Sequence, residues 1–78
     1  MDGSVIFKKL RDSVENVYLY DKYEECVLKY FVGKDGETVQ AMLKKKGQDP
    51  YLVNIKSSSI FNISQEAEET TKAFYDSY

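Results

Sequence analysis

Residues 28–43 read LKYFVGKDGETVQAML, with an apolar stretch on either side of the pair Asp35-Gly36. Asp-Gly between apolar stretches is a strong hairpin signal, because a two-residue type I′ loop needs positive φ at both central positions. Folding the chain back here opposes Lys34 to Glu37, Val32 to Val39, Phe31 to Gln40, Tyr30 to Ala41 and Leu28 to Leu43. Directly opposed residues share a face of a sheet. We therefore predict a β-hairpin with one apolar face and a type I′ turn at its tip.

The hairpin strands are predicted over residues 23–33 and 37–45, and the second strand has an alternative. Residues 40–46 are all good helix formers, and Gly47 and Pro50 beyond them are typical helix-stop signals. We favour a strand, because the hairpin register explains several residues at once, whereas a helix here has a narrow apolar face.

The chain before the hairpin predicts an amphipathic helix over residues 4–17, capped by Ser4. The residues that follow the helical spacing are Ile6, Phe7, Leu10, Val14 and Val17. Residues 17–20 alternate and favour β structure, so a short extended segment is expected at that point.

The chain after the hairpin predicts a third strand over residues 51–56, with Tyr51, Val53 and Ile55 facing inward. A last helix is expected over residues 64–77, capped by Ser64 and anchored into the sheet by Phe74. The predicted fold class is α+β, in the order α-β-β-β-α. It has a three-stranded antiparallel meander and two helices packed on one face, all in one small domain over residues 1–78.

Charge and composition narrow the class of protein. The net charge of −2 comes from 11 basic and 13 acidic residues, which is far from the strongly basic footprint of most nucleic-acid-binding domains. No stretch approaches the roughly 18 consecutive apolar residues of a membrane span. The first residues lack the basic start and apolar region of a secretory signal. The single cysteine, Cys26, favours a reducing compartment, so we expect a cytoplasmic protein with no membrane partner.

Catalytic chemistry has little support in these residues. The chain has no histidine, which is the commonest general base and metal ligand. Cys26 therefore lacks an imidazole partner, and no phosphate-binding glycine motif is present. Glu24 and Glu25 point to opposite faces of a strand, while Glu66, Glu68 and Glu69 suit a solvated helix N-terminus. We predict no enzyme activity, no cofactor and no metal site.

Partner binding is the function that the sequence favours. The second face of the first hairpin strand carries Val27 and Phe31, and Tyr18, Tyr20 and Tyr23 precede it in the chain. Exposed apolar patches rimmed by charge often mark contact sites, and tyrosine is enriched at them. We predict a non-enzymatic interaction module that acts as a regulator, inhibitor or accessory subunit of a larger protein, or that forms a homodimer. Small chains of this profile include bacterial and phage regulators.

An alternative function is weak nucleic-acid binding through a small basic patch. Its residues are Lys44, Lys45 and Lys46, together with Lys8, Lys9 and Arg11 of the first helix. This alternative requires the first helix to pack near the end of the second hairpin strand, and it predicts an affinity that falls steeply with salt.

Overall fold

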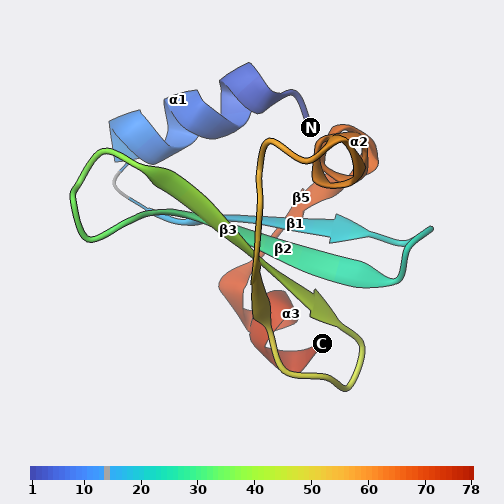
Figure 1. Ribbon diagram of the computed structural model, residues 1–78. Coiled ribbons are helices and arrows are strands. Elements are labelled where there is room, and N and C mark those ends of the chain that lie inside the picture. Colours follow the sequence, from blue (N-terminus) through green and yellow to red (C-terminus); the bar gives the residue numbers. More distant parts are fainter. Residues whose placement is uncertain (14) are drawn as a thin grey trace.

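The computed structural model describes residues 1–13 and 15–78 of the chain (Figure 1). Its elements are α1 (Gly3–Ser13), β1 (Val17–Asp21), β2 (Cys26–Val32), β3 (Val39–Lys45), β4 (Tyr51–Val53), α2 (Ser58–Glu66), β5 (Glu68–Thr70) and α3 (Lys72–Ser77). The strands form one antiparallel sheet in the order β4-β3-β2-β1-β5. The α+β class is confirmed, and the predicted meander is present as β2, β3 and β4. Two further strands, β1 and β5, extend it on the β2 side.

The central hairpin has the predicted register, so residues 39–45 form a strand and not a helix. The Asp-Gly turn differs from the prediction. Gly36 has a φ of 76°, but the one described non-glycine residue with positive φ is Glu25, so Asp35 does not adopt a type I′ conformation. Instead, the Asp35 carboxylate accepts hydrogen bonds from the backbone N–H groups of Glu37 (2.9 Å) and Thr38 (2.8 Å), and from the Thr38 hydroxyl. These bonds hold the loop of residues 33–38 between β2 and β3, because an aspartate side chain readily bonds backbone two and three residues ahead.

The hydrophobic core lies between the sheet and the pair α1 and α2. Alternation along the strands turns Leu19, Leu28 and Leu43 toward these helices, and α1 contributes Ile6 at the usual helical spacing from Leu10. Among the described residues, the buried members of this core cluster are Ile6, Leu10, Val17, Leu19, Cys26, Leu28, Tyr30, Ala41, Leu43, Ile60 and Ala67.

The first helix is shorter than predicted and starts one residue earlier. Asp2, not Ser4, supplies the capping oxygen, which accepts hydrogen bonds from the backbone N–H (2.8 Å) and the hydroxyl (2.9 Å) of Ser4. Val17 belongs to β1, where it is buried in the core. Val14, which the spacing placed on the apolar face of the helix, lies outside the described residues.

The predicted helix over residues 64–77 is wrong, because two helices and a strand occupy this region. Ser64 is not a cap but a buried residue inside α2, and its hydroxyl donates to the Phe61 carbonyl oxygen at 2.8 Å. Ala67 is extended, and the next three residues pair with β1 as β5. The short segment at residues 17–20 is thus a full strand, whose outer edge needs hydrogen-bond partners that β5 provides.

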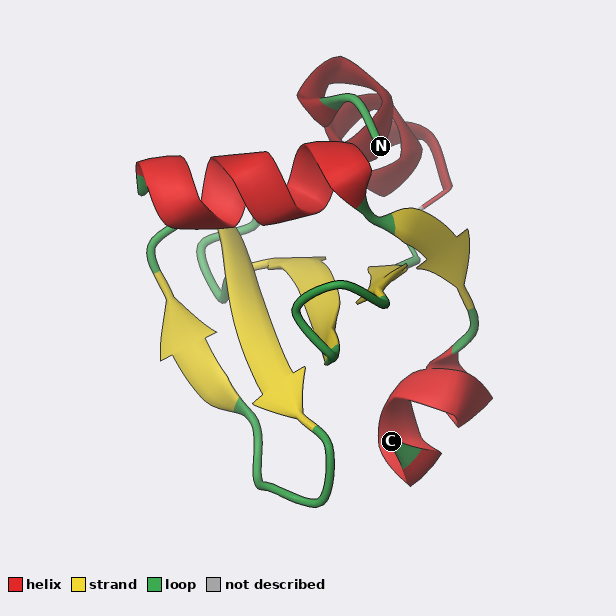
Figure 2. Cartoon of the chain, turned by 90° about the vertical axis from the view of Figure 1, so that its right-hand side faces the viewer, coloured by secondary structure: helices red, strands yellow, loops and turns green. Residues whose placement is uncertain are grey.

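The last helix, α3, packs on the sheet face opposite α1 and α2 (Figure 2). Thr71 caps it by accepting a hydrogen bond from the Phe74 backbone N–H at 3.1 Å. The anchor is Tyr75, which is 6% exposed, and not the predicted Phe74, which is 38% exposed. The expectation of two helices on one face therefore describes α1 and α2, while α3 covers part of the other face.

The N-terminus of the chain contacts the C-terminal end of α2. The Met1 ammonium group donates hydrogen bonds to the carbonyl oxygens of Ser64 (2.6 Å), Gln65 (2.8 Å) and Ala67 (2.8 Å). Carbonyl groups at a helix C-terminus lack partners within the helix and carry partial negative charge. The ammonium group therefore acts as a cap for α2 that comes from the opposite end of the chain.

Candidate functional site

The face of the sheet beneath α3 is the one on which the sequence placed the interaction surface. Cross-strand pairing aligns Tyr18, Lys29, Met42 and Leu52 in one row across β1, β2, β3 and β4. Since opposed residues share a face, the whole row points to the α3 side. This row shows how the face is divided between a covered half and an uncovered half.

The covered half lies under the aromatic residues of α3. The Tyr75 ring lies 5.4 Å from the Tyr18 ring, and the Phe74 and Tyr78 rings lie 5.0 and 5.7 Å from the Tyr20 ring, measured between centroids. Tilted and edge-on pairs at such distances are favourable aromatic contacts. This cluster removes most of the Tyr18 and Tyr20 surface from solvent.

The uncovered half carries Phe31, Met42 and Leu52, which we call the open-face patch; Lys29 and Gln40 border it. Leu52 is 61% exposed, and Phe31 and Met42 are half-buried. The Lys29 ammonium nitrogen lies 5.5 Å from the centre of the Phe31 ring, a cation–π distance. A shallow hollow of about 600 Å³ lies between Phe31 and the β2–β3 loop.

The structure places the five predicted contact residues in different environments. Val27 lies opposite Tyr20 on the α3 face, where it is 0% exposed, so its side chain does not form a surface patch. Tyr18 and Tyr20 are half-buried beneath α3, and Tyr23 is 75% exposed in the β1–β2 loop, with the Lys22 ammonium 5.3 Å from its ring centre. Of the five, only Phe31 lies in the open-face patch.

Met42 and Leu52 were missing from the predicted surface, although the sequence held a signal for each. The hairpin register opposes Met42 to Lys29, on the same face as Phe31. An inward Tyr51 and Val53 imply an outward Leu52. The arrangement of β4 beside β3 was needed to bring Leu52 next to Met42.

The structure does not bring the six predicted basic residues together. α1, which carries Lys8, Lys9 and Arg11, lies on the sheet face that it shares with α2. The end of β3, which carries Lys44 and Lys45, lies near the C-terminus (Figure 1). Lys9 pairs with the Glu69 carboxylate at 2.8 Å. The Lys44 ammonium donates to the backbone oxygens of Tyr75 and Asp76, at 3.2 and 3.0 Å. Lys45 and Lys46 are exposed.

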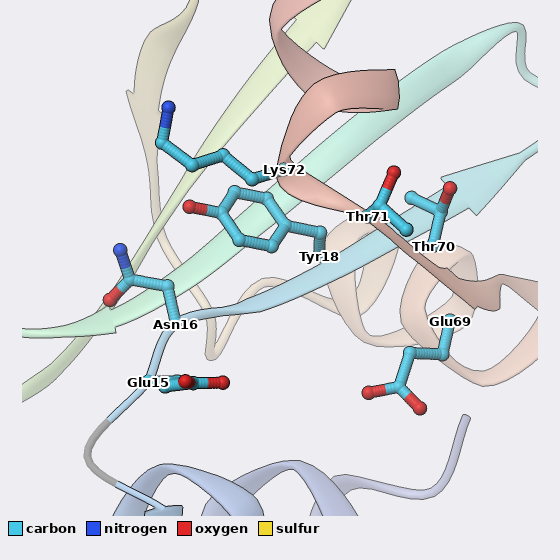
Figure 3. Close-up of a pocket in the computed structure, with 7 residues that line it drawn as sticks. All are labelled: Glu15, Asn16, Tyr18, Glu69, Thr70, Thr71 and Lys72. Atoms are coloured by element: carbon cyan, nitrogen blue, oxygen red, sulfur yellow. The ribbon is translucent and has the colours of Figure 1, made fainter.

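A hollow of about 570 Å³ lies at the sheet edge formed by β1 and β5, between Tyr18 and Lys72 on one side and Glu15 and Glu69 on the other (Figure 3). The Lys72 side chain runs past the Tyr18 ring, while the two carboxylates lie toward α1. Lys72 pairs with Asp76 at 2.6 Å, and Glu69 pairs with Lys9. Lys72 and Glu69, which lie on opposite sides of the hollow, are thus each held in an ion pair.

Cys26 lies in the interior, where it is 1% exposed. Burial raises the pKa of its thiol to about 11, and the nearby charges of Asp21 and Glu24 act in the same direction. A nucleophilic cysteine needs the opposite, a lowered pKa and access to substrate. In the described part of the chain, no group of three or more possible metal ligands comes together.

A second apolar hollow, of about 650 Å³, separates α1 from the tip of the central hairpin. Phe7 and Val32 are its exposed apolar residues, and Arg11, Glu15 and Glu37 place charges of both signs around it.

No protein-family model, no curated protein and no solved structure matches this chain. Among the described residues, no helix is both long enough and apolar enough to cross a membrane.

Proposed function

We propose that this chain is a small non-enzymatic protein-interaction module, a regulator, inhibitor or accessory subunit that binds a larger protein through the open-face patch. The observation that carries the proposal is the row Lys29, Met42 and Leu52, which runs from β2 to the edge strand β4 and which α3 leaves uncovered. Among the aliphatic residues of β2, β3 and β4, Leu52 has the largest exposed fraction. Exposed apolar surface of this kind, with a charged border, is typical of contact sites.

The open-face patch lies on regular secondary structure and not on a loop or a chain end. Phe31, Met42 and Leu52 lie on three neighbouring strands whose backbones are hydrogen-bonded to one another. A rigid scaffold holds such side chains in place before binding, which lowers the ordering cost of association.

The proposal is tested by affinity capture with the intact chain from cells that encode it, followed by reconstitution with each captured protein in pure form. Wild type is compared with Leu52→Ser and Phe31→Ser, and with Phe61→Ser as the matched control. Phe61 is 50% exposed on α2, on the other side of the sheet.

We expect a captured partner to bind wild type and Phe61→Ser with the same Kd. It should bind Leu52→Ser at least about tenfold more weakly, because about 1.4 kcal/mol of lost apolar contact corresponds to a factor of ten. Light scattering of each purified variant measures self-association over the same concentrations. A partner or a dimer that forms equally well with both patch variants would contradict the proposal.

A further inference from the structure

α3 shows how this chain covers one half of the sheet face itself. Tyr75, Phe74 and Tyr78 turn their rings toward Tyr18 and Tyr20. The helix is six residues long, so it spans only part of the sheet, and it ends beside the β3–β4 turn, where the Gly47 backbone N–H donates to the Tyr78 carbonyl oxygen at 3.1 Å. A longer or second helix laid along α3 would cover the remaining half.

Lysine side chains surround the C-terminal end of α3 where it meets the sheet. The Lys44 ammonium bonds the last carbonyl oxygens of α3, at Tyr75 and Asp76. A hydrogen bond from Lys72 lowers the pKa of the Asp76 carboxyl, and the charges of Lys44 and Lys29 lower it further. The face thus presents lysines to the negative end and the carboxylate of the helix that it holds.

The uncovered half of the face also combines apolar side chains with lysine. Its apolar floor is Met42 and Leu52, and the Lys29 ammonium stands beside Phe31 at 5.5 Å from the ring centre. Lys34 lines the hollow at the far side of Phe31. The adjoining carboxylates are engaged, since Asp76 pairs with Lys72 and Asp35 bonds its own loop.

We propose that the open-face patch binds an amphipathic helix of the partner that carries carboxylates beside its apolar side chains, and that this helix lies next to α3. The inference rests on the proposed function and specifies the partner's chemistry. Complementary charge steers such an encounter and disfavours partners of the wrong sign. A nucleic-acid strand suits the patch less well, because Phe31 is its one ring, and Met42 and Leu52 give further bases no ring on which to stack.

The test uses two synthetic helical peptides with identical apolar positions, one with glutamate and one with lysine at its polar positions. Each is titrated into the intact isotope-labelled protein while the methyl signals of Met42 and Leu52 are followed by NMR. We expect the glutamate peptide to shift both signals and to bind about tenfold more tightly than the lysine peptide. Lys29→Glu should abolish this difference, whereas Lys8→Glu, the same charge change on α1, should leave it intact.

The outcomes separate the two proposals. If both peptides shift the Met42 and Leu52 signals with equal affinity, the preference for carboxylates is wrong and the proposed function stands. If neither peptide shifts them, the inference of a helix beside α3 is wrong, whereas the proposed function falls only if a captured partner or a dimer forms equally well with both patch variants. Signals that change with protein concentration alone identify a second copy as the occupant, and salt-sensitive shifts with a single-stranded oligonucleotide identify nucleic acid; either result overturns the inference.

Discussion

At the scale of single residues, two aspartates organise the hairpin loops in the same way. Asp21 accepts a hydrogen bond from the Tyr23 backbone N–H at 2.9 Å, and Asp35 accepts one from Glu37 at 2.9 Å. In each loop the acceptor precedes the donor by two residues, the pattern of an Asx turn. The Asp-Gly signal therefore located the central turn correctly but for another reason: the carboxylate bonds the loop, and Gly36 alone takes the positive φ.

The Asp35 loop gives a prediction for the pH dependence of stability. Hydrogen bonds from the Thr38 hydroxyl and from the Glu37 and Thr38 backbone lower the Asp35 pKa to about 2, from an ordinary value of 3.8. The native state then binds fewer protons than the unfolded state, so this carboxylate stabilises the fold above about pH 4 and the contribution is lost as pH falls toward 2. We expect Asp35→Asn to be less stable than wild type at pH 6 and equally stable near pH 2, measured by urea unfolding.

Asp49→Asn is the control, since Asp49 is an exposed aspartate of the β3–β4 loop. It should follow wild type throughout the pH range. A stability difference between wild type and Asp35→Asn that stays constant from pH 6 to pH 2 would contradict the role of the charge.

At the scale of elements, α3 is held by one buried aromatic residue. Tyr75 packs on Tyr18, and the Lys44 ammonium lies 5.9 Å from its ring centre. Among the described residues, its buried hydroxyl has no hydrogen-bond partner. An unpaired buried hydroxyl is unfavourable, so the ring and not the hydroxyl must stabilise this contact.

We therefore predict opposite effects for two substitutions at this position. Tyr75→Phe should leave the free energy of unfolding unchanged or raise it by about 1 kcal/mol, because the unpaired hydroxyl is removed. Tyr75→Ala should release α3, seen as fast hydrogen exchange over residues 72–77 while the core strands stay protected. If Tyr75→Phe lowers the stability by more than about 1 kcal/mol, the hydroxyl has a partner and the interpretation is wrong.

At the scale of the whole molecule, the N-terminal part of the chain is joined to residues 64–70. The Met1 ammonium caps α2, and β5 closes the sheet beside β1, with Glu69 paired to Lys9 of α1. The Met1 hydrogen bonds join residues 63 to 66 positions apart, and the Lys9–Glu69 pair joins residues 60 positions apart. Such long-range contacts hold α1 and α2 against the sheet. They matter in a domain of this size, because a small domain buries little apolar surface in its core.

The ammonium cap can be tested directly. Acetylation of the Met1 amino group removes the positive charge and leaves a single N–H donor for three carbonyl oxygens. We expect a loss of about 1–2 kcal/mol, because a cation at a helix C-terminus and charge-assisted hydrogen bonds contribute in this range. For a domain of this size each kcal/mol lowers Tm by roughly 4–8 °C, so calorimetry of the two forms measures the effect. Identical Tm values for the free and acetylated forms would show that the cap contributes nothing.

Local patterns were sufficient for the centre of the fold. The apolar alternation around Asp35 and Gly36 set the pairing of β2 with β3, because a shift of one residue would turn every core side chain to solvent. The same alternation placed Phe31 on the face that now carries the candidate site, and helical spacing placed Ile6 and Leu10 in the core.

Tertiary contacts determined the rest. Residues 64–77 have helical spacing throughout, yet the open edge of β1 offered backbone hydrogen bonds that outweighed this preference at Glu68–Thr70. That strand carried the chain to the other face of the sheet, where α3 buried Val27, Tyr18 and Tyr20 and left Phe31, Met42 and Leu52 uncovered. The sequence specified which residues share a face, since alternation is a local property of a strand. Which half of that face stays open depended on where β5 and α3 pack, and this is a property of the whole molecule.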